Sequence, residues 1–72
     1  MTEGRLYYNS DNQRYGLMNR GKWEIEGFHC GVVLEIWLDG QWQPTRIEYG
    51  EDWYLVGFPG LVLYDLKARV EL

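Results

Sequence analysis

The sequence contains one cysteine, one histidine and two prolines among its 72 residues. A single cysteine, Cys30, excludes an internal disulfide, and one Cys with one His is too few for a structural zinc site, which takes four ligands. His29 and Cys30 are adjacent, so in an extended chain they point to opposite sides and do not form a nucleophile–base pair. We therefore expect no metal and no cofactor, and we interpret Cys30 as a small apolar filler of a half-buried loop.

Long apolar runs and the known catalytic motifs are also missing. No apolar stretch approaches the ~20 residues of a membrane span, and residues 1–5 are not followed by the apolar region of a secretory signal. The sequence has no Gly-rich phosphate loop and no HExxH, CxxC or GxSxG motif. We expect a cytoplasmic protein that is not an enzyme, as a monomer or weak dimer.

Basic residues are few, with seven Lys and Arg against eleven Asp and Glu. Residues 1–22 hold four basic and two acidic residues, a net charge of +2, whereas residues 23–72 hold three and nine, a net charge of −6. Nucleic acid is not favoured as a partner, because non-specific binding to it depends on clustered Lys and Arg. The acidic portion is either ordinary solubility charge or a face for a partner with a basic surface.

Aromatic residues, by contrast, make up 17% of the chain and fall in short alternating runs typical of strands. No segment shows a helical stripe longer than a turn. Trp23 and Ile25 are expected on one face of their strand, and residues 61–66 form either a strand or one helical turn. Strands are expected over residues 4–9, 14–19, 22–26, 32–38, 41–49, 53–57 and 67–72. This pattern predicts one all-β domain over residues 1–72, a small, strongly bent antiparallel sheet or an SH3-like barrel of five to seven short strands.

Asp39 and Gly40 give the strongest hairpin signal, because a type I′ turn needs positive φ at both central residues. A two-residue turn there pairs Trp37 with Trp42, a cross-strand contact that contributes ~0.2–1 kcal/mol. The same register places an ion pair diagonally between Glu35 and Arg46. It predicts that the core face of the hairpin holds Leu34, Ile36, Leu38, Thr45, Ile47 and Tyr49.

The Trp37–Trp42 pair then lies on the face opposite the core. It is either an exposed contact patch with Pro44 and Arg46, or it is covered by the N-terminal strands or by residues 58–66. Trp and Arg carry much of the binding energy at protein interfaces, which favours a contact role. The acidic group Glu48, Glu51 and Asp52 at the far end of the hairpin is either a solvated turn or an acidic contact site.

A second interpretation concerns the N-terminal strands. Tyrosines alternate there with arginines, which is the pattern of a stacking platform for single-stranded nucleic acid. The alternative is that these tyrosines fill a thin core with their hydroxyls at its edge. The residues concerned are Arg5, Tyr7, Tyr8, Arg14, Tyr15 and Arg20.

The chain resembles an uncharacterised family of small bacterial domains from Firmicutes, often found on their phages and conjugative elements. The matching stretches are GRLYYN (4–9), HCG (29–31), DGQWQPTRIE (39–48), WYLVG (53–57), PG (59–60) and LKARV (66–70). The resemblance brings no known activity or catalytic residues. It implies a mobile-element protein, and we expect a small acidic module that binds a host protein, with an inhibitor of a defence nuclease of the CRISPR or restriction type as the specific hypothesis.

Overall fold

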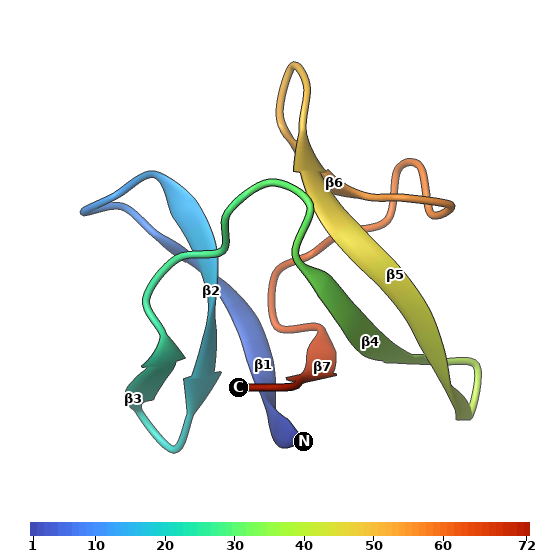
Figure 1. The fold of residues 1–72 in the computed structure, drawn as a ribbon, viewed down its shortest axis with the longest axis horizontal. Coiled ribbons are helices and arrows are strands. Elements are labelled where there is room, and N and C mark those ends of the chain that lie inside the picture. The colour runs from blue at the N-terminus through green and yellow to red at the C-terminus, as the bar shows by residue number, and fades with distance from the viewer.

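The computed structural model describes residues 1–72 as seven strands joined by turns and loops (Figure 1). It contains no helix, so no helical segment is available to cross a membrane. The strands are β1 (Thr2–Asn9), β2 (Arg14–Asn19), β3 (Lys22–Ile25), β4 (Val33–Leu38), β5 (Gln41–Tyr49), β6 (Trp53–Leu55) and β7 (Lys67–Val70). The predicted all-β class is confirmed.

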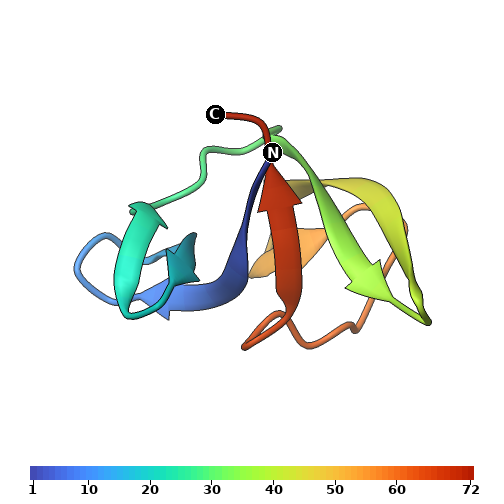
Figure 2. The ribbon, with the colours of Figure 1, turned by 90° about the horizontal axis from the view of Figure 1, so that it is seen from below.

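The strands form one antiparallel sheet in the order β3-β2-β1-β7-β4-β5-β6. Figures 1 and 2 show that the sheet is open and strongly curved, with β7, the last strand, in its middle between β1 and β4. The edge strands β3 and β6 have only four and three residues, which limits the open edge that another chain can pair with. Of the two forms expected, the structure has the bent sheet, and both termini lie side by side next to its centre.

The β4–β5 hairpin has the predicted register. Asp39 and Gly40 have φ values of 54° and 76°, as a type I′ turn requires. Trp37 lies opposite Trp42, and Leu34 lies opposite Thr45. Leu34, Ile36 and the β5 residue Ile47 are fully buried on the concave side, so the predicted core face is confirmed for them. Tyr49, which was predicted on that face, is 57% exposed because it lies at the open end of the strand.

The core is one cluster on the concave side of the sheet. Strands supply most of it, and two loops add Phe28 and Leu63. Thr45 is the one buried polar residue, and its hydroxyl donates a hydrogen bond of 2.8 Å to the Val56 carbonyl. The strand residues of the cluster are Leu6, Leu17, Leu34, Ile36, Ile47, Leu55, Ala68 and Val70.

Two local predictions are wrong. Trp23 and Ile25 do not share a face, because β3 contains a β-bulge with Glu24 as the extra residue. Ile25 lies opposite the core residue Leu17, whereas Trp23 lies opposite Met18 and points away from the core. Residues 61–66 form neither a strand nor a helical turn; they are a loop that buries Leu63.

The prediction that Cys30 is an apolar filler of a half-buried loop is also wrong. It is exposed, because the buried side chain of this connection is Phe28, whose amide donates a 2.8 Å hydrogen bond to the Tyr15 carbonyl.

Candidate functional site

The convex surface of the sheet, which we call the outer face, carries the side chains that alternate with the core residues. In β7, Lys67 and Arg69 point outward because Ala68 and Val70 are buried. Trp37 lies on the same side in β4, which pairs with β7, and Trp42 lies opposite it in β5, the next strand. The order of the sheet therefore brings two basic residues from the end of the chain beside the tryptophan pair.

These four residues pack together, and we call them the Trp patch. The indole rings of Trp37 and Trp42 meet edge to face, with centroids 5.3 Å apart and an interplanar angle of 69°. The Arg69 guanidinium lies 4.2 Å from the Trp42 ring centroid, and the Lys67 ammonium lies 5.3 and 5.6 Å from the Trp37 and Trp42 centroids. Each of these cation–π contacts stabilises the patch by ~0.5–1 kcal/mol at an exposed site.

The Trp patch is open to solvent. Strands β1–β3 do not fold over it, because they continue the same sheet on the far side of β7. The loop of residues 61–66 packs on β1 instead. The Asp65 amide donates a 2.8 Å hydrogen bond to the Leu6 carbonyl, and the Tyr64 ring meets the Tyr7 ring edge to face. Trp37 remains 39% exposed.

The ion pairs of the outer face differ from the predicted one. Arg69 donates a 2.7 Å hydrogen bond from Nε to Oε1 of Glu35, and its Nη2 lies 2.6 Å from the same oxygen in the ion pair. Arg46 pairs with Glu48 at 3.0 Å. The Glu35–Arg46 pair is wrong because Arg69 lies directly opposite Glu35, whereas Arg46 lies opposite Val33, and diagonal neighbours are farther apart.

The residues predicted for a protein contact fall into two groups. Trp37, Trp42 and Arg46 share the outer face with Glu48. Glu51 and Asp52 lie in the β5–β6 turn, at the other end of β5 from Trp42. There Asp52 accepts a 2.8 Å hydrogen bond from the Trp53 amide, a local turn contact.

The arginines and tyrosines of the N-terminal strands also divide. Arg5, Tyr7 and Arg20 line a hollow of the outer face. The other three, Tyr8, Arg14 and Tyr15, lie away from it. They cluster toward the β5–β6 turn, where the rings of Tyr8 and Tyr15 meet edge to face with centroids 5.4 Å apart.

Two of these tyrosines have perturbed acidities. The Tyr7 hydroxyl donates a 2.6 Å hydrogen bond to the Asp65 carboxylate, and this bond, followed by partial desolvation, raises the pKa of Tyr7. Partial burial raises the pKa of Tyr15, with the charge of Asp52 adding to it. Both shifts favour the neutral phenol, so neither group is prepared to act as a base.

A second hollow, of about 330 Å³, lies between the β1–β2 and β5–β6 turns. The Trp53 indole donates a 3.0 Å hydrogen bond to the Gln13 carbonyl, and the Arg14 guanidinium lies 5.5 Å from the Trp53 ring centroid. Cys30 and Tyr49 complete its wall. No three His, Cys, Asp or Glu side chains lie close enough together to hold a metal ion.

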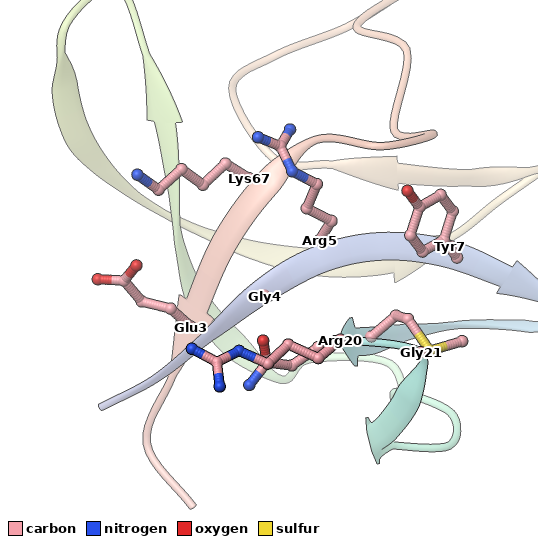
Figure 3. A pocket seen from close by; sticks show the side chains of 9 residues that line it. Glu3, Gly4, Arg5, Tyr7, Arg20, Gly21 and Lys67 are labelled. Carbon is pink, nitrogen blue, oxygen red and sulfur yellow. The ribbon is translucent and has the colours of Figure 1, made fainter.

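The hollow of the outer face holds about 320 Å³ (Figure 3), and Lys67, a member of the Trp patch, is one of its lining residues. We call it the basic hollow, because three cationic side chains, Arg5, Arg20 and Lys67, line it against one carboxylate, Glu3.

Sequence reasoning missed Lys67 and Arg69 as site residues. Their alternation with Ala68 indicates that they point outward, but only the position of β7 in the sheet shows what they lie beside.

Charge is distributed unevenly between the faces. Five of the seven basic residues, Arg5, Arg20, Arg46, Lys67 and Arg69, lie on the outer face or its turn. Four of the eleven acidic residues lie with them: Glu3, Glu35, Glu48 and Asp65. These nine residues therefore have a net charge of 5 − 4 = +1, and the other charged residues of the chain 2 − 7 = −5.

The fold defines a small all-β domain built on one open, bent antiparallel sheet. The chain belongs to a family described as a domain of unknown function, DUF5348, which its residues 4–70 match. It is also similar to the crystal structure of a protein from Ruminococcus gnavus, a structural genomics target, with a TM-score of 0.84 and 36% sequence identity over 96% of this chain and 100% of that one. No curated protein matches the chain.

These comparisons confirm the resemblance to an uncharacterised family and give a relative from a Firmicute. They offer no support for an origin on a phage or another mobile element, which stays a prediction.

Proposed function

We propose that this protein is a non-catalytic protein-binding module whose contact surface is the Trp patch. The observation that carries the proposal is a tryptophan pair on the outer face, with Trp37 exposed, against which two basic side chains of β7 pack. Trp and Arg are enriched among the residues that dominate binding energy at protein interfaces. Because the rings are already fixed by their neighbours, little side-chain freedom is lost when a partner docks.

The state of the indole rings supports a protein partner over bases. A base stacks on a free ring face, and each stacked base contributes ~1–3 kcal/mol. Here Arg69 lies over Trp42, and Lys67 lies near both rings. Stacking would require these cations to move, whereas protein side chains can pack on the exposed edge of Trp37 and bond to the cationic groups.

Single-stranded nucleic acid is the second candidate, and one observation favours it. Five of the seven basic residues share one face with aromatic residues that include Tyr7, Trp37 and Trp42. The family and the related structure point to no nuclease and no defence system. The proposal therefore names a protein partner without assigning it to a defence enzyme.

The test is capture from a host extract with the immobilised protein, followed by calorimetry with the purified partner. Trp37→Ala should weaken that binding at least about tenfold, as truncation of an interface hot spot does. Val62→Ala is the matched control, because it removes an apolar side chain that is 73% exposed and lies outside the patch. Equal affinities of the two variants would contradict the proposal.

A further inference from the structure

The basic hollow and the Trp patch form one continuous surface. Arg5 of β1 lies directly opposite Lys67 of β7, and the Lys67 ammonium lies 5.3 Å from the Trp37 ring centroid. Trp37 in turn lies opposite Trp42. A row of two cations and two indoles therefore runs across β1, β7, β4 and β5, perpendicular to the strands.

The cations of the hollow are only partly neutralised within the chain. Arg5 donates a 2.8 Å hydrogen bond to the Asp65 backbone carbonyl, and its Nε lies 3.8 Å from the Asp65 carboxylate. Lys67 and Arg20 have no carboxylate within 4 Å. The side chains extend from β1, β7 and the β2–β3 turn around the hollow, with Glu3 as its one acidic residue (Figure 3).

We infer that the basic hollow binds a carboxylate group of an acidic segment of the protein partner, while an apolar side chain of the same segment packs on Trp37. This inference rests on the proposed function and names the chemistry of the partner at that surface. Lys and Arg recognise carboxylates by charge-assisted hydrogen bonds. Lys67 belongs to both parts of the surface, so the two contacts reinforce each other.

The spacing of the row sets the shape of the segment. The hollow lies over β1, between β2 and β7, and Trp37 lies on β4, two strands from β1, so about two inter-strand spacings of ~4.8 Å separate the centres of the two contacts. A segment in the polyproline II conformation rises ~3.1 Å per residue with three residues per turn, so side chains three positions apart point to the same side, about 9.3 Å apart. We therefore expect the apolar residue about three positions from the acidic one.

The chemistry of the rest of the molecule favours a carboxylate over a nucleic-acid backbone. Apart from the nine charged residues named above, the chain has a net charge of −5, which repels a long polyanion more than a short acidic segment. Arg69 lies over the Trp42 ring and Lys67 lies near both rings, so a base would have to displace these cations in order to stack.

The test is an NMR titration of the ¹⁵N-labelled protein with acetyl-Glu-Glu-Gly-Ser-Leu-amide. The same peptide with Gln in place of both Glu residues is the uncharged control, and a twelve-residue oligothymidine tests the nucleic-acid alternative. We expect the acidic peptide to shift the amide signals of Arg5, Gly21 and Lys67 and the indole signal of Trp37. The Gln peptide should leave the three amide signals in place.

Two variants of equal charge test the position of the site. Arg20→Asn removes a cation of the hollow, and Asn tolerates the left-handed backbone at this turn, where φ is 53°. Lys22→Gln removes one charge two residues away, on an exposed β3 position that does not line the hollow. Arg20→Asn should weaken the acidic peptide about two- to fivefold, the range of one exposed charge pair, and Lys22→Gln distinctly less.

Each remaining outcome has a definite meaning. If Trp37 responds to both peptides and the hollow to neither, the proposed function survives and the inference is overturned. If the hollow responds to the acidic peptide but Trp37 responds to nothing, the anion site stands and the proposed function is contradicted. Tighter binding of oligothymidine than of the acidic peptide at the same residues would overturn the choice of a protein segment.

Discussion

Replacement of Trp42 by alanine tests the structure of the Trp patch most directly. The change removes the edge-to-face contact with Trp37 and the stacking of Arg69 at 4.2 Å. An aromatic pair of this geometry contributes ~0.5–1.5 kcal/mol, and an exposed cation–π contact ~0.5–1 kcal/mol. We therefore expect Trp42→Ala to lower the free energy of unfolding by about 1–2.5 kcal/mol.

This magnitude differs from what the hairpin alone implies. A cross-strand pair by itself predicts a loss below about 1 kcal/mol. The larger value comes from Arg69, which the sheet order places over the ring. Trp37→Ala is the matched control, because it removes the same aromatic pair but leaves the closer Arg69 contact behind. It should cost less than Trp42→Ala.

The measurement is urea unfolding followed by far-ultraviolet circular dichroism at 25 °C, with the slope m unchanged. A double-mutant cycle of Trp42→Ala with Arg69→Gln isolates the pairwise contribution, because the loss of the Glu35 ion pair cancels in the cycle. A coupling energy of zero, or a loss of less than about 0.5 kcal/mol for Trp42→Ala, would refute the stacked patch. A loss above about 3 kcal/mol with a changed m would show that Trp42 belongs to a core layer.

Three further predictions concern the core, an acidity and the cysteine. Ile36→Ala should cost about 2–5 kcal/mol because Ile36 is fully buried, whereas Val33→Ala on the same strand, 67% exposed, should stay within about 0.5 kcal/mol; equal urea midpoints would contradict the face assignment. The raised pKa of Tyr7 means that its hydrogen bond to Asp65 contributes stability below pH 10, which is lost as the pH rises through the folded-state pKa. The free energy of unfolding of Tyr7→Phe should therefore fall less than that of the wild type between neutral and alkaline pH. If the two proteins show the same pH dependence of unfolding, the hydrogen bond does not make this contribution. Cys30→Ser should fold, and a zinc chelator should leave the melting temperature unchanged; a collapse of melting with chelator would overturn this.

Local chemistry predicts the β4–β5 hairpin well. Asp39 and Gly40 allow one tight turn, and a two-residue turn leaves only one register for the strands that it joins. Alternation along β4 then assigns Ile36 to the core and Trp37 to the outer face, as observed. The half of the candidate site that lies on this hairpin could therefore be predicted from the sequence.

The other half could not be predicted, because it depends on pairing between distant segments. Alternation shows that Lys67 and Arg69 share a face but carries no information on which strands flank β7. The same limit explains the wrong partner assigned to Glu35. The bulge at Glu24 is a second kind of failure, since one unpaired residue reverses the face of Trp23 without changing the composition of the strand.

The order of the sheet also decides what the charges mean. Residues 23–72 have a net charge of −6, which by itself favours a basic partner, yet Arg46, Lys67 and Arg69 are the three basic residues of that portion, and all three lie on the outer face. They join Arg5 and Arg20 there only because the last strand lies between β1 and β4. The same insertion supplies Trp42 with its stacking cation and connects the basic hollow to Trp37 through Lys67. If β7 lay at an edge of the sheet, Trp37 and Trp42 on the β4–β5 hairpin would have no cations beside them, and Arg5 and Arg20 would form a separate group on the N-terminal strands. The candidate site is thus a consequence of one long-range strand placement.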